Sequence, residues 1–184
     1  MNLILKTENL LLRPWELKDK DDLVQGLNNL NVSKWLAVVP YPYTERFAEE
    51  FIAYCIENKT DGYSFAIELL SENKVIGGTN INKINPVQGT ASGGIWLNEA
   101  YHGHGYGTEA FRKRAEFAFN VLNLRRLESG CFAGNEASLG MQQKIGYVVE
   151  GLRRKGFLCR ADGQYKDEIT MALLREDWII EKSI

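Results

Sequence analysis

Three glycines at alternating positions lie where a strand-like segment gives way to a helix-like one. Gly103, Gly105 and Gly107 follow the extended segment 90–97, and the spacing of apolar residues predicts an amphipathic helix over 105–122. Without Cβ atoms, backbone N–H groups can converge at such a loop. A helix start also carries about half a positive charge. The segment therefore predicts a site for a phosphate or pyrophosphate group, and a glycine-rich turn that only starts a helix is the alternative.

The surrounding residues restrict which phosphate ligand could bind there. A Walker loop requires Gly-Lys-Ser/Thr, which the sequence lacks, so a nucleoside triphosphate is disfavoured. The degenerate dinucleotide pattern Gly105-x-Gly107-x-x-Ala110 is present, with Glu128 near the place of a ribose-binding acid. That pattern belongs to the first βα turn of a fold with several further βα units. Here only the 74 residues 111–184 follow it, and they are mostly strand-like, so the topology disfavours an NAD-type cofactor.

The remaining hydrophobic patterns indicate one continuous domain over residues 1–184. Alternating apolar residues are typical of strands, and apolar residues three and four apart are typical of helices. Strands are expected at 9–13, 63–69, 74–84, 90–97, 126–132, 147–158 and 164–174. Helices are expected at 17–29, after an N-cap at Thr44, at 105–122, at 135–145 before a C′ glycine at Gly146, and at 175–182. These elements predict a mixed α+β fold.

Composition disfavours several classes of protein. The chain has 22 Lys+Arg and 24 Asp+Glu among 184 residues, which argues against a nucleic-acid partner. Its longest apolar runs are too short to span a bilayer and its start lacks a signal-peptide pattern, so no membrane partner is expected. Three separated cysteines are expected as reduced thiols in a cytoplasmic protein. His102 and His104 lack further ligands nearby, so no metal is expected.

Four ordered blocks of the sequence resemble the GNAT superfamily of acetyl-CoA-dependent N-acyltransferases, and within it the RimJ/RimL branch. Gly103–Ala110 matches that branch's form of the phosphate loop almost completely, with His102 where the superfamily commonly has Arg or Gln. The other blocks are Thr7–Arg13, the stretch from Asn135 to Arg154, and Tyr165–Glu168. The resemblance implies a GNAT fold, in which a mostly antiparallel seven-stranded sheet has splayed central strands and is flanked by helices.

The resemblance also implies how acetyl-CoA, the cosubstrate, would bind. The central strand would pair with the pantetheine, the glycine loop would hold the pyrophosphate, Asn135 would bond the pantetheine arm, and Lys144 would approach the phosphates or the adenine. By residue type alone, Asn135 is equally an N-cap, and the histidines are surface or cofactor-contacting groups. The implied cofactor-binding residues are Ile95, Trp96, Leu97, His102, Gly103, His104, Gly105, Tyr106, Gly107, Thr108, Asn135, Ser138 and Lys144.

For catalysis, the resemblance implies direct attack of an amine on the acetyl thioester, with Ser138 as the catalytic residue that donates a hydrogen bond to the departing CoA thiolate. The superfamily often uses a tyrosine on the same helix, at the position occupied here by Gln142, which is no acid. A backbone amide near Leu97 is expected to polarise the acetyl carbonyl. The sequence fixes no general base, and the candidates Glu68, Glu99 and Asp167 are equally surface carboxylates.

The acceptor is expected to be a primary amine, first of all the α-amine of a protein N-terminus of the ribosomal-protein type. Its pKa of about 7.7–8.0 leaves part of it neutral near pH 7.5. The branch also includes enzymes for amino acids, polyamines and aminoglycoside-like drugs. The acidic residues that could serve such amines look like a solvated helix face: Glu49, Glu50, Glu57 and Asp61. A non-catalytic acyl-CoA-binding module is the alternative from another class, and a homodimer is left open.

Overall fold

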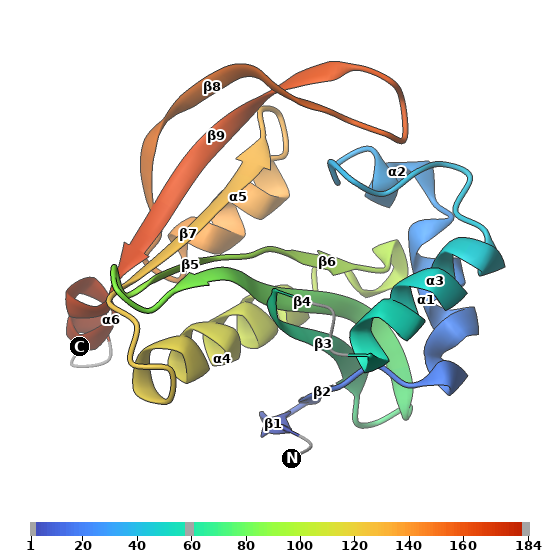
Figure 1. Cartoon of the computed structure of the whole chain (residues 1–184), viewed down its shortest axis with the longest axis horizontal. Helices are drawn as coiled ribbons and strands as arrows, with labels where there is room; N and C mark the ends of the chain where they lie inside the picture. The colour runs from blue at the N-terminus through green and yellow to red at the C-terminus, as the bar shows by residue number, and fades with distance from the viewer. Residues whose placement is uncertain (1–2, 58–60, 182–184) are drawn as a thin grey trace.

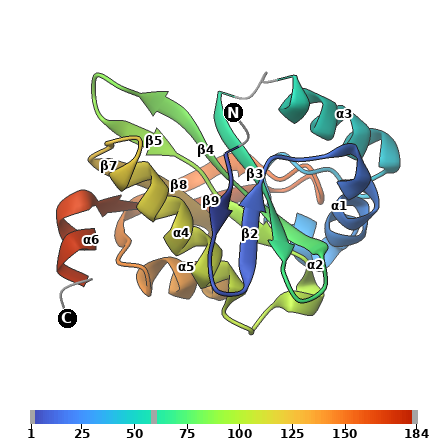
Figure 2. The ribbon, with the colours of Figure 1, turned by 90° about the horizontal axis from the view of Figure 1, so that it is seen from below.

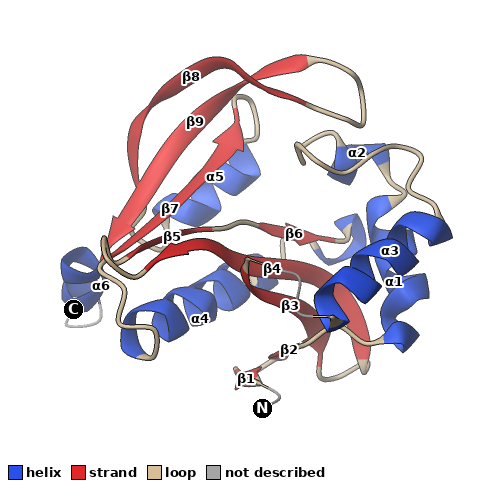
Figure 3. Cartoon of the chain, in the orientation of Figure 1, coloured by secondary structure: helices blue, strands red, loops and turns tan. Residues whose placement is uncertain are grey.

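The computed structural model describes residues 3–57 and 61–181 and shows a twisted, forked sheet with helices packed against it (Figure 1). The described strands are β1 (Leu5–Lys6), β2 (Leu10–Arg13), β3 (Gly62–Leu69), β4 (Lys74–Asn85), β5 (Thr90–Ser92), β6 (Ile95–Leu97), β7 (Arg126–Phe132), β8 (Val148–Leu158) and β9 (Tyr165–Leu174). The described helices are α1 (Lys20–Leu27), α2 (Leu30–Ser33), α3 (Glu45–Ile56), α4 (Tyr106–Asn120), α5 (Glu136–Gln143) and α6 (Arg175–Glu181), with 3-10 turns at Leu17–Asp19 and Glu99–Tyr101. Figure 3 separates the two kinds of element by colour. None of these helices is long and apolar enough to cross a bilayer.

The sheet divides into two arms at its centre. Its described strands follow the order β1-β2-β3-β4-β5-β7-β9-β8, and β6 pairs with β4 outside this path. Among the described pairs only β5 and β7 run parallel, over Thr90–Ser92 and Arg126–Glu128. Beyond that contact β6 stays with β4 while β7 stays with β9, and Figure 1 shows β6 and β7 diverging. The fork thus leaves one edge of β6 and one edge of β7 without a strand neighbour.

Two close contacts shape the point where the fork opens. A Cβ atom on Gly93 would lie 2.1 Å from the carbonyl oxygen of Asn80, so the close approach of these backbones requires glycine. The Arg114 side chain of α4 is fully buried beside it, donates from Nε to the Asn80 carbonyl at 2.7 Å, and lies 4.3 Å from the centre of the Phe111 ring. The guanidinium therefore ties α4 to the strand at the base of the fork.

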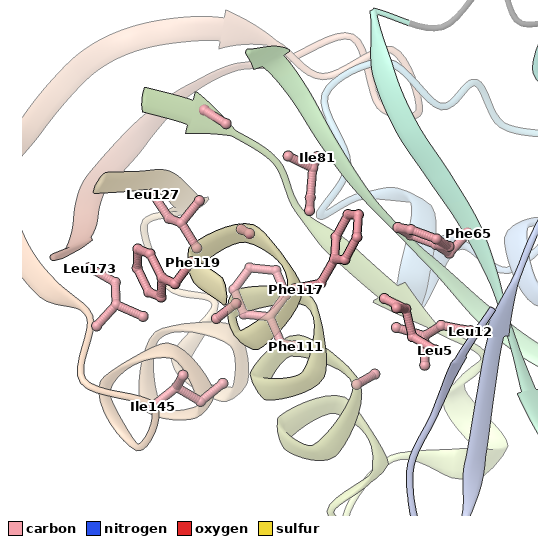
Figure 4. Close-up of a cluster of buried hydrophobic side chains, with 14 of the residues drawn as sticks. Leu5, Leu12, Phe65, Ile81, Phe111, Phe117, Phe119, Leu127, Ile145 and Leu173 are labelled. Carbon is pink, nitrogen blue, oxygen red and sulfur yellow. The ribbon is translucent and has the colours of Figure 1, made fainter. Parts of the chain in front are cut away.

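Two apolar clusters hold helices against the sheet. Phe111, Phe117 and Phe119 of α4 are each at most 4% exposed and pack against the strands, as the close-up in Figure 4 shows. Figure 2 shows α4 along the sheet from below. The second cluster surrounds Trp15 and fixes α1 and α3 through Leu23, Leu27, Ala48 and Ile52. Each fully buried side chain of this size contributes about 1.5–3 kcal/mol, so both helix layers are firmly seated.

The predicted elements are confirmed in type, and the differences have local causes. The strand expected at 90–97 is interrupted at Gly93–Gly94 and forms β5 and β6. That break and the two-residue β1 make nine strands in the described sheet where seven were expected. The four-residue α2 was not predicted. The last helix is described to Glu181, and Lys182 lies outside the described residues.

Candidate active site

A cleft of about 1160 Å³ occupies the fork between β6 and β7. At one end it is lined by the glycine loop, the first turn of α4 and helix α5, which we call the glycine end (residues 103–108 and 135–144). At the other end it is lined by aromatic side chains from both arms, which we call the aromatic end: Trp35, Phe47, Phe51, Tyr54, Phe132 and Phe157. The three central-strand residues Ile95, Trp96 and Leu97 also line the cleft.

The glycine loop at the start of α4 presents unpaired backbone donors. Gly103 and Gly105 have φ of 80° and 85°, a conformation that side chains disfavour. The first helical hydrogen bond of α4 runs from Glu109 N to the Gly105 carbonyl at 3.0 Å. Within the described chain, the N–H groups of Tyr106, Gly107 and Thr108 therefore have no backbone acceptor. These donors, at the positive end of a 15-residue helix, can bind an anion.

The two histidines of this loop have different surroundings. His102 lines the cleft, and its Nε2 lies 2.9 Å from the Leu97 carbonyl. Because a carbonyl only accepts, Nε2 is the protonated nitrogen and His102 fixes the end of β6. His104 instead stacks on Tyr106 at 5.7 Å, and both side chains lie outside the cleft lining. In the described ranges no cluster of three His, Cys, Asp or Glu residues is arranged to hold a metal.

The edge of β6 facing β7 carries free backbone groups. Asn98 N donates to the Ile76 carbonyl at 2.8 Å, and Asn80 N donates to the Gly94 carbonyl at 3.2 Å. Because hydrogen-bonded pairs alternate in an antiparallel ladder, Trp96 pairs with Gly78 while the backbones of Ile95 and Leu97 face away from β4. The Leu97 N–H group is therefore directed into the fork, where a ligand carbonyl could accept from it.

Helix α5 places three polar side chains along the cleft. Asn135 Oδ1 accepts from Ser138 N at 3.2 Å, which confirms its N-cap role, and no hydrogen bond within the described chain uses its Nδ2 group. Ser138 Oγ accepts from Gln142 Nε2 at 3.2 Å, so its own hydroxyl hydrogen can be donated to another acceptor, such as the neighbouring Cys131 sulfur. Gln142 is only 2% exposed and its Oε1 has no partner in the described structure. Lys144 ends the helix, exposed beside the cleft.

The neighbouring thiol of β7 stays protonated. Burial raises the pKa of Cys131, and the nearby Ser138 hydroxyl opposes that rise. Cys131 is 8% exposed and lines the cleft. All three cysteines are free thiols, in agreement with the reduced state expected from the sequence.

Two of the three carboxylates predicted as bases, Glu68 and Asp167, lie outside the cleft lining, and a carboxylate that was not predicted lies in it. Glu68 is paired with Arg13 at 2.6 Å, and Asp167 accepts from Lys155 N at 2.7 Å. Glu99 lines the cleft edge, where hydrogen bonds from two asparagines lower its pKa. Glu168 of β9 also lines the cleft, and burial raises its pKa. A carboxyl with a raised pKa in a cleft is suited to accept a proton near neutral pH.

Glu168 retains free accepting capacity. Arg153 Nη1 lies 3.0 Å from Oε2 in an orientation that makes no hydrogen bond, and this oxygen has no hydrogen-bond partner among the described residues. A Cβ atom on Gly130 would lie 2.7 Å from Oε1, so the glycine leaves room for the carboxylate beside β7. In the sequence, Glu168 belongs to the block Tyr165–Glu168 that resembles the RimJ/RimL branch, but its neighbour Asp167 was the candidate general base. Because successive strand residues point to opposite faces, only one of the two can face the cleft.

Comparison with known proteins agrees with this geometry. The acetyltransferase (GNAT) domain matches residues 9–148. Spermidine N(1)-acetyltransferase of Escherichia coli K12 is 29% identical over 92% of this chain and 88% of its own length. The ribosomal-protein-serine acetyltransferase of that strain is 30% identical over 53% of this chain and 55% of its own. A crystal structure of a GNAT-family acetyltransferase from Bacillus anthracis has a TM-score of 0.83 and 26% identity, covering 95% of this chain and 99% of that one. The forked sheet, the glycine loop and these similarities together show that the chain belongs to the GNAT acetyltransferase family, in its RimJ/RimL-like branch.

Proposed function

We propose that the protein, acting as a single domain, transfers the acetyl group of acetyl-CoA to the α-amine of a protein N-terminus. One observation carries the proposal. The free edge of β6 and the free N–H groups at the start of α4 line one continuous cleft. A ligand that fits both must be extended and able to form hydrogen bonds along its length, and must carry a phosphate group at one end. Acetyl-CoA has this shape, and it is the cosubstrate of the family.

The residues of the glycine end and of β6 provide groups that can bind the successive parts of CoA. The amides of Tyr106, Gly107 and Thr108 would bind the pyrophosphate, and Ile95 and Leu97 would pair with the pantetheine. The free Nδ2 of Asn135 and the unpartnered Oε1 of Gln142 offer a donor and an acceptor to its amide groups. Lys144 would lie near the phosphates. The backbone at His104 and Tyr106 belongs to this loop, while their side chains lie outside the cleft.

The catalytic roles follow from the direction of proton movement. The amine nitrogen bonds to the acetyl carbon, the carbon–sulfur bond breaks, the nitrogen loses one proton and the sulfur gains one. Glu168 accepts the proton, directly or through a water molecule, because its Oε2 has no hydrogen-bond partner among the described residues and its pKa is raised. Ser138 donates a hydrogen bond that stabilises the departing thiolate, and the sulfur then gains its proton from Glu168 through solvent. The Leu97 N–H stabilises the negative charge on the carbonyl oxygen.

The acceptor amine must be neutral to react. An α-amine with a pKa of about 7.7–8.0 is partly neutral near pH 7.5, whereas a lysine amine with a pKa of about 10.4 is neutral about once in a thousand molecules. Glu168 is thus a sufficient base for an α-amine. A small-molecule amine is the second candidate, because one relative of this chain is named for spermidine.

Release of free CoA thiol from acetyl-CoA tests the proposal directly. Thiol release should require both the protein and a peptide with a free N-terminus, and an N-terminally blocked peptide should give none. Ser138→Ala should lower kcat by roughly tenfold to a hundredfold, the loss of one hydrogen bond to a charged group, with little change in the affinity for CoA.

Ser71→Ala in the exposed turn after β3 is the matched control and should retain full activity. If calorimetry shows CoA binding but no amine supports thiol release, the chain is the non-catalytic acyl-CoA-binding module. Absence of CoA binding would overturn both functions.

A further inference from the structure

The aromatic end of the cleft is lined by rings from both arms of the fork. Phe47, Phe51 and Tyr54 come from α3, while Phe132 of β7 and Phe157 of β8 come from the other arm. Phe132 and Phe157 lie 6.4 Å apart, centre to centre, at an angle of 51°. Cationic side chains cover part of these rings, with Lys166 Nζ 5.5 Å from the centre of the Phe132 ring and Arg153 5.6 Å from that of Phe157. The remaining ring surfaces, with Trp35, give this end of the cleft an apolar lining. Such a surface favours an apolar or aromatic group over a hydrated one.

Two hydrogen bonds connect the loop after α2 to the hairpin of β8 and β9 beside this surface. Arg160 N donates to the Ala37 carbonyl at 3.1 Å, and Lys166 Nζ donates to the Lys34 carbonyl at 2.8 Å. These bonds join the loop after α2 to the hairpin formed by β8 and β9, two segments of the chain that approach each other in Figure 1. A group bound at the aromatic end is therefore shielded from water on that side.

The charges around the aromatic end disfavour a polycation. Lys34 and Lys166 place their ammonium groups 5.5 and 5.6 Å from the centre of the Trp35 ring, and Arg160 lines the cleft. The acidic residues nearby are Glu50, Glu168 and Asp162; Asp162 is already paired with Lys166 at 2.6 Å, and Glu168 lies 3.0 Å from Arg153. An amine with several positive charges would meet these cations and lose its hydration, and there are too few free carboxylates to compensate.

We infer that the acceptor is a primary amine bearing a bulky apolar group, preferably aromatic, next to its nitrogen. The inference rests on the proposed function, since it places the amine near Glu168 and its substituent among the rings of the aromatic end. The apolar surroundings also favour the neutral form of the amine, which is the reactive form. Both a peptide N-terminus and a small amine can carry such a group next to the nitrogen, and the test below compares peptides with amino acid amides to separate them.

The acceptor preference can be measured with two matched series. Peptides that differ only in their first residue (Phe, Leu, Ala or Ser) and the amides of the same amino acids are each supplied with acetyl-CoA, with spermidine as a further acceptor. We expect kcat/KM for Phe and Leu to exceed that for Ala, Ser and spermidine by at least about tenfold, the size of one well-buried apolar contact. Higher rates for peptides than for amides identify the peptide as the source, and the reverse identifies the small amine.

Variants of the aromatic end provide a second test. Phe157→Ala should raise KM for phenylalaninamide by about tenfold while leaving KM for alaninamide and the affinity for CoA unchanged. Tyr165→Ala is the control, because this aromatic residue on the same hairpin is 66% exposed and lies outside the cleft lining. Equal KM values in the two variants would overturn the inference.

The inference and the proposed function can fail separately. Turnover without preference, or a preference for spermidine, overturns the inference alone. If no acceptor is turned over, the proposed function fails. In that case, calorimetry of the CoA-loaded protein with N-acetylphenylalaninamide and N-acetylalaninamide still tests whether the aromatic end prefers an aromatic group. Equal affinities, or no binding, would overturn the inference.

Discussion

Gly105 is the residue whose backbone conformation most directly serves the anion site. Its φ of 85° costs a non-glycine residue about 1–2 kcal/mol, and no atom lies within 4 Å of a Cβ built there. Gly105→Ala should therefore weaken CoA binding through backbone strain rather than collision, by roughly fivefold to thirtyfold in Kd measured by calorimetry. Gly163→Ala is the matched control, because Gly163 has φ of 71° and equally open space in the turn between β8 and β9. An unchanged Kd for Gly105→Ala would remove the loop from the binding site.

Glu168 should control the acidic side of the pH profile. Burial raises the pKa of its carboxyl, so the proton-accepting form is lost as the pH falls through a value above the usual range for glutamate. In the profile of kcat/KM, Glu168→Gln should abolish this ionisation and leave only that of the acceptor amine, with a rate about a hundredfold lower. Asp167→Asn, one residue earlier but hydrogen-bonded to Lys155 N, should keep the original profile. Identical profiles for both variants would exclude Glu168 as the base.

For single residues, the residue type predicted the local backbone role better than it predicted the hydrogen-bond partner of the side chain. Asn135 has the N-cap role that its type favours, and the glycines have the backbone conformations expected of a loop at a helix start. The Leu97 carbonyl as the partner of His102 could not be read from the sequence, because that bond depends on how the loop folds back. Glu168 was missed for a similar reason. The register of β9, fixed by its pairing with β7 and β8, decides which of two adjacent acids faces the cleft.

We expect one contact between elements to affect acceptor binding. It joins the hairpin of β8 and β9 to the loop after α2. Lys166 Nζ donates to the Lys34 carbonyl at 2.8 Å and lies 2.6 Å from Asp162 Oδ2. Lys166→Met keeps much of the side-chain volume and removes a charged hydrogen bond worth about 1.5 kcal/mol. The expected result is a rise in the acceptor KM of about tenfold with an unchanged Kd for CoA, measured by initial rates and calorimetry.

Lys18→Met provides the comparison, since Lys18 forms an exposed ion pair with Glu16 and its side chain is 67% exposed. A parallel loss of CoA affinity in Lys166→Met would show that the contact supports the whole cleft rather than its aromatic end.

Local patterns predicted most helices and strands, whereas the fork was predicted only by the resemblance to the GNAT superfamily, which the structure confirms. Helix α4 has apolar residues at helical spacing and β3 alternates, so each pattern specifies its own element. The break at Gly93–Gly94 depends instead on the Asn80 carbonyl and on buried Arg114, which come from two other elements. Similarly, the four residues of α2 are too few for a periodic signal.

For the whole molecule, ligand binding should appear as a change in thermal stability. A ligand that binds only the folded state at a hundred times its Kd stabilises it by about 2.7 kcal/mol. For a chain of this size that corresponds to a rise in Tm of roughly 5–11 °C. CoA should give this shift in a thermal scan and NAD should not. A shift with NAD alone would favour the dinucleotide alternative and contradict the assignment of the cleft.

The fork also changes where the molecule exposes unsatisfied main-chain groups. In an ordinary sheet such groups lie on the perimeter, where strands of other proteins can add to them and start aggregation. Here the edges of β6 and β7 are turned inward, facing each other between two arms. A foreign strand would have to enter the cleft between the two arms to reach these edges, whereas it could add to a perimeter edge from outside. The unpaired main-chain groups thus lie where a ligand in the cleft can use them and where edge-to-edge pairing with another protein is restricted.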